Sequence, residues 1–171
     1  MRRKIHFLAF AAFCASFAIE ASAADVIRHK IPNSDFPIAQ AVEIPSGNSL
    51  VFLSGVGPDV ADKSAAKDSP AVFGDTKTQT ISALTKIDAT LKSLGLSMKD
   101  VVKMQAFLVG DPQNGDKIDF ASFMDGYKKF FGTADQPNLP ARSAMKVAGL
   151  AVPGWLIEIE VTAVRAETKK P

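Results

Sequence analysis

Apolar residues along this chain occur in two patterns, short runs and a helical period, and the short runs mark six expected β-strands. The six segments are rich in apolar and β-branched residues and are bounded by glycine, proline or other turn-forming residues. They cover residues 26–31, 39–44, 50–54, 101–109, 141–150 and 156–164. The second and third segments are separated by Pro45-Ser46-Gly47-Asn48, a strong turn signal, so we expect these two segments to pair as a hairpin.

Two other segments have the period of a helix. After Asp75, apolar residues recur every three or four positions and place one apolar stripe along a helix. The residues of this stripe are Ile81, Leu84, Ile87, Leu91 and Leu94. Asp75 or Thr76 can cap the start of this helix, and Gly95 can end it. A second helix is expected over residues 120–131, whose aromatic residues lie near one face and are more typical of a core than of a cofactor site.

The order of these elements predicts an α+β fold. Three strands precede the first helix, one strand separates the two helices, and two strands follow, which differs from strict strand–helix alternation. We therefore expect a mixed sheet with both helices packed on one face. Residues 57–74 combine prolines, alanines and mixed charge and are expected to form a long loop, a kind of segment that is often functional. Residues 24–171 have the length of a single domain.

The N-terminus has the pattern of an export signal. Arg2, Arg3 and Lys4 precede an apolar run at residues 7–19, and the small residues at 21–23 match a signal-peptidase site. The apolar run is shorter than the roughly 20 residues that a membrane-spanning helix needs, so an N-terminal membrane anchor is the weaker alternative. We expect residues 1–23 to be a signal peptide and the mature chain to be secreted or periplasmic, free of the membrane.

Cleavage after residue 23 changes which chemistry the chain can carry. The precursor has 20 Lys and Arg against 18 Asp and Glu, but the signal peptide holds three of the former and one of the latter, so the mature chain is neutral. A neutral chain disfavours nucleic acid as a partner, because binding needs a clustered basic surface. Cleavage also removes Cys14, the only cysteine, and leaves His29 as the only histidine. This composition excludes cysteine nucleophiles and thiolate metal sites, and it disfavours a Ser-His-Asp site or a zinc site.

Five motifs occur in a fixed order over most of the expected mature chain. They are AQAV at 39–42, VFLSG at 51–55, GLS at 95–97 with DVVK at 100–103, YKKFF at 127–131, and PARS at 140–143 with LIEIEV at 156–161. Together these motifs resemble the Rid family, also known as YjgF or endoribonuclease L-PSP. Each motif is weak by itself, and the specificity of the resemblance lies in their common order.

This resemblance implies a chorismate-mutase-like fold and a homotrimer whose three sheets form an inner barrel, with active sites in clefts between subunits. It also implies hydrolysis of reactive enamines or imines, such as 2-aminoacrylate, to a 2-oxo acid and ammonia. Neither a metal nor an organic cofactor is expected for that reaction. The implied ligand is a small carboxylate.

Three residues match positions of the family that contact the substrate or its water. Arg142 matches the arginine that holds the substrate carboxylate, which suits the paired donors of a guanidinium, although a surface salt bridge is the alternative. Glu158 matches the glutamate associated with the attacking water, for which it could act as general base. On a strand it shares a face with Glu160, and both could instead be solvated or salt-bridged. Ser54 matches a serine beside the pocket, but it could equally just end its strand.

Three positions depart from the pattern of the deaminases. Ile38 stands where they carry a tyrosine that lines the pocket, Met124 where they carry an asparagine, and Ala144 where they carry a cysteine. The contribution of that cysteine is ascribed to its backbone carbonyl, which Ala144 retains. The apolar Ile38 leads to the hypothesis that Arg142 selects a 2-imino acid with a bulkier or more apolar side chain than 2-aminoacrylate.

Two further classes of function are open to the same residues. Ile38 and Met124 make the expected cleft more apolar while Arg142 still binds an anion, which favours a trimeric protein that holds a small carboxylate without converting it. A ribonuclease, which one family name suggests, is disfavoured by the neutral charge and lone histidine of the expected mature chain.

Overall fold

The computed structural model describes residues 25–65 and 70–166. The expected signal peptide lies outside these residues. Within the described ranges, no helix is long and apolar enough to cross a membrane.

Six strands form one mixed sheet, which confirms the predicted α+β class. Their spatial order is β1-β2-β5-β4-β6-β3, and β5 lies parallel to both of its neighbours while the other pairs are antiparallel. The strands are β1 (Ile27–Lys30), β2 (Ala39–Glu43), β3 (Asn48–Val56), β4 (Val101–Leu108), β5 (Ala141–Lys146) and β6 (Ile157–Ala166). β5 ends earlier than expected, since residues 147–150 lie outside the ladder.

The expected hairpin between residues 39–44 and 50–54 is wrong. β2 pairs with β1 and β5, whereas β3 pairs with β6 at the opposite edge of the sheet. The turn itself is present, with Gly47 at a φ of 83°. A turn signal predicts only that the chain reverses its direction. It does not determine which strand pairs with the segment after the turn. Beside β6, Leu53 and Val56 of β3 pack against the apolar core under the helices, which stabilises this pairing.

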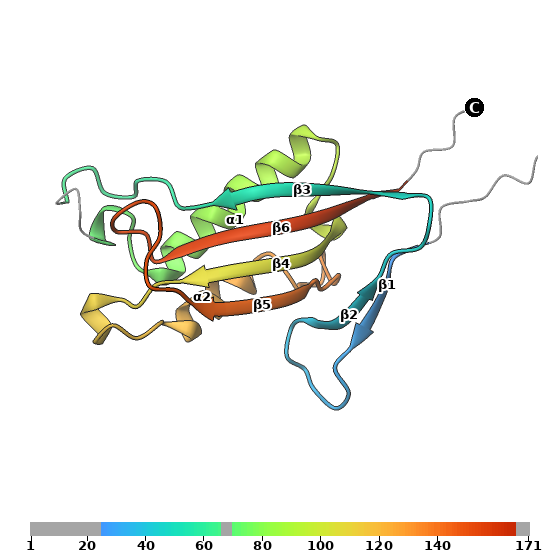
Figure 1. Ribbon diagram of the computed structural model, residues 1–171, viewed down its shortest axis with the longest axis horizontal. Coiled ribbons are helices and arrows are strands. Elements are labelled where there is room, and N and C mark those ends of the chain that lie inside the picture. The colour runs from blue at the N-terminus through green and yellow to red at the C-terminus, as the bar shows by residue number, and fades with distance from the viewer. Residues whose placement is uncertain (1–24, 66–69, 167–171) are drawn as a thin grey trace, which may run out of the picture.

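Both helices cover the same face of the sheet, as predicted (Figure 1). α1 (Thr76–Ser93) begins at Asp75, whose carboxylate accepts from the Thr78 N–H at 2.7 Å. The helix ends before Gly95, which has a φ of 72°, so both predicted ends are confirmed. Leu84, Ile87 and Leu91 of the predicted stripe are buried. Leu94 is 41% exposed because it lies just beyond the last helical turn.

The second helix, α2 (Phe120–Tyr127), is shorter than the expected residues 120–131. After Tyr127 the chain continues in tighter turns, in which the Phe130 N–H donates to the Tyr127 carbonyl oxygen at 3.0 Å. Phe123, Tyr127 and Phe131 are fully buried, so these three aromatic residues belong to the core as predicted. Phe120 at the start of the helix is 38% exposed and lies outside that core.

One buried side chain of α1 ties two loops to the helix. The amide of Gln79 donates to the carbonyl oxygens of Gly74 and Gly154 at 2.9 and 3.1 Å, and its oxygen accepts from the Leu156 N–H at 2.8 Å. Gly74 ends the predicted long loop at residues 57–74, which contains the short 3-10 helix η1 (Pro70–Val72). Two further 3-10 helices, η2 (Met98–Asp100) and η3 (Pro112–Asn114), flank β4.

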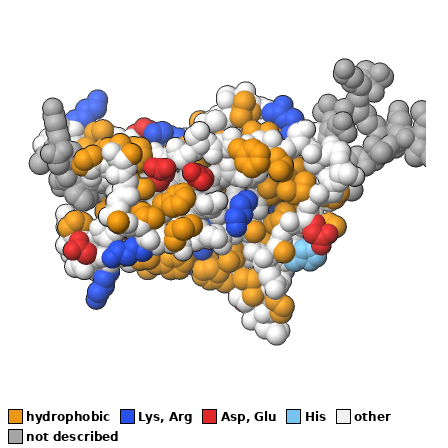
Figure 2. Space-filling model, in the orientation of Figure 1, with side chains coloured by type: hydrophobic (Ala, Val, Ile, Leu, Met, Phe, Trp, Pro, Cys, Tyr) orange, Lys and Arg blue, Asp and Glu red, His pale blue; other side chains and the backbone are white. Residues whose placement is uncertain are grey.

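The other face of the sheet is open, and we call it the open face. It is the face that Figure 2 presents, where hydrophobic side chains are interspersed with acidic and basic ones. Three large apolar side chains point from its strands: Leu50 is 45% exposed, Phe52 74% and Met145 36%. These side chains leave apolar surface exposed on the open face.

Candidate functional site

Arg142 lies on the helix-covered side of the sheet, near its edge. It is the second residue of β5 and stands opposite the fully buried Met104 of β4. Side chains of paired residues share one face, so the guanidinium of Arg142 is directed toward α2. The residue is half-buried rather than splayed into solvent.

Four aromatic rings surround the Arg142 guanidinium. Its central carbon lies 4.4 Å from the ring centroid of Tyr127, 5.0 Å from Phe123, 5.6 Å from Phe36 and 5.9 Å from Phe120. These are cation–π distances, and rings of this kind stack on the faces of a guanidinium. The four rings therefore hold the cation and offer its N–H groups no acceptor as strong as an anion.

Arg142 has no carboxylate partner within the described part of the chain. None of the ion pairs found there includes it, and its one recorded hydrogen bond runs from Nη1 to the Met124 sulfur at 3.2 Å. A thioether is a weak acceptor. Burial lowers the pKa of Arg142 from its ordinary value, and the Coulombic interaction with Tyr127 acts in the opposite direction. Arginine stays protonated even so, which leaves a partly desolvated cation facing an apolar wall.

The segment before β2 is fastened to this site. The Tyr127 hydroxyl donates to the Pro37 carbonyl oxygen at 2.8 Å, and the Ile38 N–H donates to the Phe36 carbonyl oxygen at 2.8 Å. Ile38 is half-buried and adjoins the segment that carries Phe36 onto Arg142. The structure thus brings predicted residue Ile38 into the neighbourhood of Arg142.

Ala144 lies on the same strand as Arg142 and two residues further on. Successive strand residues alternate, so the two share a face of the sheet. Ala144 is exposed. Met124, buried in α2, completes this first group of predicted residues through its contact with Nη1 of Arg142.

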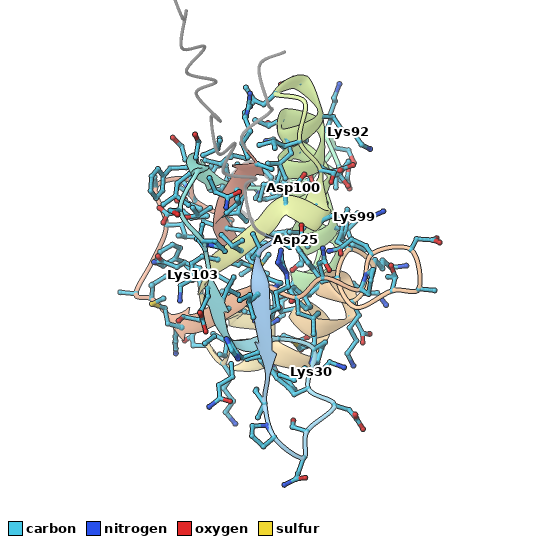
Figure 3. All side chains as sticks on the ribbon, turned by 90° about the vertical axis from the view of Figure 1, so that its right-hand side faces the viewer. Asp25, Lys30, Lys92, Lys99, Asp100 and Lys103 are labelled. Carbon is cyan, nitrogen blue, oxygen red and sulfur yellow. The ribbon has the colours of Figure 1, made fainter. Side chains whose placement is uncertain are left out.

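Glu158 and Ser54 belong to the open face instead. Ile157 and Ile159 of β6 are fully buried against the helices, which directs Glu158 and Glu160 to the other side as predicted. Glu158 lies over Gly55, where a Cβ would collide with its carboxylate. Ser54 and Glu160 line a hollow of about 360 Å³ on this face. Lys103 also lines it, and Figure 3 shows that residue on the side of the molecule opposite α1.

Within one chain, the predicted site residues therefore fall into two groups. Arg142 and Ala144 lie on the helix-covered side, and Ile38 follows Pro37, which is bonded to Tyr127 of α2, while Glu158 and Ser54 lie on the open face. The described chain does not bring the cation and the candidate base together. The two groups face opposite sides of the sheet.

Two features of the site were not anticipated from the sequence. Phe36 lies over Arg142 although it is about a hundred positions away, and the only signal was its place two residues before Ile38. Gly55 makes room for Glu158, and the bulge in β3 between Leu53 and Val56 that places it there has no clear sequence signature.

Comparison with known proteins identifies the family to which this chain belongs. Residues 29–165 match the family model described as Endoribonuclease L-PSP. A RutC family protein of Haemophilus influenzae is 35% identical over 136 residues, which are 80% of this chain and 92% of that protein. The 2-iminobutanoate/2-iminopropanoate deaminase of Salmonella typhimurium is 34% identical over 129 residues, which are 75% of this chain and 88% of the relative.

The fold agrees with a solved structure as well. The crystal structure of Escherichia coli TdcF with bound serine superposes with a TM-score of 0.53 at 31% identity, covering 80% of this chain and 94% of TdcF. The chain therefore belongs to the endoribonuclease L-PSP family, the Rid or YjgF family that its motifs predict.

Proposed function

We propose that this protein hydrolyses small reactive 2-imino acids to 2-oxo acids and ammonia, with the substrate carboxylate held by Arg142. The observation that carries the proposal is the state of the guanidinium: half-buried, within cation–π distance of four aromatic rings, and without a carboxylate partner among the described residues. A desolvated cation of this kind is stabilised by an anion, and a carboxylate fits its paired donors. The deaminase relative and the serine bound to TdcF support a ligand of this class.

The reacting site, in this proposal, forms between subunits of a homotrimer. One protomer contributes Arg142, and its neighbour contributes Glu158 and Ser54 from the open face. The opposite placement of the two groups in a single chain supports this arrangement, because no motion of one side chain could bring them together through the sheet. The exposed apolar side chains of the open face also favour a second copy as partner.

Each residue then has a defined part in the reaction. Arg142 fixes the carboxylate, so that the imine carbon faces the water near Glu158. The Glu158 carboxylate takes a proton as the water oxygen bonds to that carbon, and the C=N bond becomes a C–N bond. Glu158 passes that proton to the nitrogen, which gives a carbinolamine. As the C–N bond breaks, the Glu158 carboxylate carries the hydroxyl proton to the departing nitrogen, so ammonia leaves and the former water oxygen becomes the carbonyl oxygen of the 2-oxo acid.

A non-catalytic carboxylate-binding protein is the second candidate. The observation that favours it is the apolar setting of Arg142, whose nearest recorded acceptor is the Met124 sulfur. That half of the site can hold a carboxylate without the base on the open face. Binding of 2-oxo acids that depends on Arg142, together with undetectable deamination, would favour this candidate.

Kinetics with one matched pair of variants tests the role of Arg142. An amino-acid oxidase supplies imino acids, and the loss of the semicarbazone product reports their hydrolysis. Arg142→Ala removes charged hydrogen bonds and should lower kcat/KM by about 10- to 100-fold. Arg165→Ala is the control, since exposed Arg165 donates to the Leu94 carbonyl oxygen at 2.7 Å and has no ion pair within the described residues. If Arg142→Ala hydrolyses imino acids as well as the wild type does, the proposal is refuted.

Subunit mixing tests the location of the site. Arg142→Ala and Glu158→Gln should each be inactive alone, but a trimer containing both has some interfaces with an intact Arg142 facing an intact Glu158. Random assembly of an equal mixture should restore about a quarter of the wild-type activity. Activity of the co-refolded mixture no higher than that of either variant would place both residues in one protomer's site or remove Glu158 from the reaction.

We also propose that the chain is exported and acts on imines formed outside the cytosol, such as those released by amino-acid oxidases or dehydrogenases. The basic, apolar and small-residue order of residues 1–23 supports this location. Expression of the full chain in a bacterium, followed by mass spectrometry of the periplasmic fraction, should find a protein that begins at Ala24. Full-length protein confined to the cytosol would contradict export.

A further inference from the structure

We propose that Phe36 and Phe120 are specificity-determining residues that bind an apolar side chain of the acid held by Arg142. This inference rests on the proposed function and names its substrate class. The expected substrates are 2-imino acids with branched or aromatic side chains, and 2-aminoacrylate should be a poor substrate.

The four rings around Arg142 fall into an inner and an outer pair. Phe123 and Tyr127 are fully buried and belong to the core of the domain. Phe36 and Phe120 lie 5.6 and 5.9 Å from the guanidinium carbon, yet they are 41% and 38% exposed. The outer pair therefore forms an apolar rim beside the cation, with ring surface that the domain itself does not cover.

The geometry of a guanidinium links this rim to the ligand. A carboxylate binds in the plane of the guanidinium, whereas aromatic rings occupy its faces. The side chain of a 2-imino acid is attached one carbon away from its carboxylate. Once Arg142 holds the carboxylate, that side chain lies within reach of Phe36 and Phe120, and its burial against the rings removes apolar surface from water.

The surroundings of the cation disfavour a polar side chain. Within the described residues, the Arg142 guanidinium contacts four aromatic rings and the sulfur of Met124. The Met124 side chain is itself buried, with the residue 6% exposed. A hydroxyl, amide or second carboxylate on the ligand would lose hydrogen bonds to water without gaining new ones from these groups. The same walls accept a branched or aromatic hydrocarbon.

The rim is also held in place before the ligand arrives. Phe120 is the first residue of α2, whose N-cap Asp119 accepts from the Ser122 N–H at 3.0 Å. Phe36 precedes Pro37, whose carbonyl oxygen accepts from the buried Tyr127 hydroxyl. A pre-formed apolar surface discriminates between ligands at a smaller cost in ordering than a mobile one.

Calorimetric binding of stable 2-oxo acids tests the proposal on the assembled protein. The probes are pyruvate, 4-methyl-2-oxopentanoate and 3-phenyl-2-oxopropanoate, which share one carboxylate and differ in the side chain. The wild type should bind the two larger acids about tenfold or more tighter than pyruvate, as expected for extra apolar groups in a pocket. Phe36→Ala and Phe120→Ala should each reduce that preference, because they weaken the binding of the two larger acids more than the binding of pyruvate.

Two controls separate specificity from general damage. Leu94→Ala removes an apolar side chain with the same 41% exposure as Phe36, but at the far end of α1, and it should leave the preference unchanged. Phe120→Gln keeps a long side chain and good helix propensity while replacing the ring with an amide, so it tests the rim even if Phe120→Ala destabilises α2.

The outcomes distinguish this inference from the proposed function. Binding that depends on Arg142 but ranks pyruvate equal to the larger acids, or rim variants that weaken all three acids equally, overturns the inference alone. Absence of any binding that depends on Arg142 overturns the proposed function together with it. Binding does not require turnover, so the binding test of Phe36 and Phe120 is still valid if the protein has no deaminase activity.

Discussion

Tyr127 is the residue whose replacement tests the site architecture most directly. Its ring centroid lies 4.4 Å from the central carbon of the Arg142 guanidinium, and its hydroxyl donates to the Pro37 carbonyl oxygen at 2.8 Å. Tyr127→Phe removes only the hydroxyl and keeps the ring. Loss of this partly buried hydrogen bond should cost about 1 kcal/mol of unfolding free energy, or about 2–4 °C in Tm for a domain of this size. The segment that carries Phe36 should loosen at the same time, which weakens 2-oxo acid binding.

The pH dependence of Tyr127 gives the prediction a second, independent test. Burial raises the pKa of the Tyr127 phenol, and the nearby Arg142 only partly offsets this. In the unfolded chain the phenol ionises near its ordinary pKa of about 10. The folded state then holds more protons than the unfolded state above that pH. The stability contributed by the neutral phenol is therefore complete below about pH 10 and is lost as pH rises toward the folded-state pKa.

The stability and titration measurements can each be assigned to a single residue because of the amino-acid composition. The sequence has one tyrosine and one tryptophan, so phenolate absorbance reports Tyr127 alone and fluorescence reports Trp155 alone. Urea unfolding at several pH values should show a steeper alkaline loss of stability for the wild type than for Tyr127→Phe. If the native phenol titrates near pH 10, or if Tyr127→Phe unfolds at the same urea concentration as the wild type, the inferred burial and hydrogen bond are wrong.

Two further predictions concern Glu158 and the start of α2. Gly55→Ala should displace the Glu158 carboxylate and lower kcat by about tenfold or more. Gly149→Ala is the control, because a Cβ at Gly149 meets open space, and it should leave kcat unchanged. Equal kinetics of the two variants would contradict the placement of Glu158. Asp119→Ala removes the N-cap of α2 and should cost about 1 kcal/mol at pH 7 by urea unfolding. Hydrogen bonds from Ser122 lower the pKa of Asp119, so the contribution of this cap is lost as pH falls through that depressed pKa; an unchanged difference between wild type and variant at acid pH would refute it.

Local sequence signals predicted the elements well but not all of their partners. The caps of α1 and its buried residues Leu84, Ile87 and Leu91 follow from spacing and capping chemistry, which act within a few residues. The pairing of β3 with β6 depends on which distant strand offers the better apolar surface, and a turn signal at residues 45–48 contains no information about that choice.

In the candidate site, too, local sequence signals were informative, whereas contacts between distant residues could not be predicted. Motif order predicted Arg142 and Glu158 as site residues, and strand alternation correctly placed Glu158 and Glu160 on one face. The enclosure of Arg142 by rings from α2 and from the segment before β2 was not predictable from spacing, because it joins residues that are far apart in the chain. The aromatic residues of α2, expected only as core, also cover the cation.

The amide of Gln79 has a consequence for how one end of the molecule can move. It donates twice to carbonyl oxygens and accepts once from an N–H, a combination that a carboxylate or a hydrocarbon of the same length does not supply. The end of the 57–74 loop and the turn before β6 are therefore coupled through a single uncharged group in α1. A displacement of either segment must break bonds to the same side chain, so the two segments should open and close together.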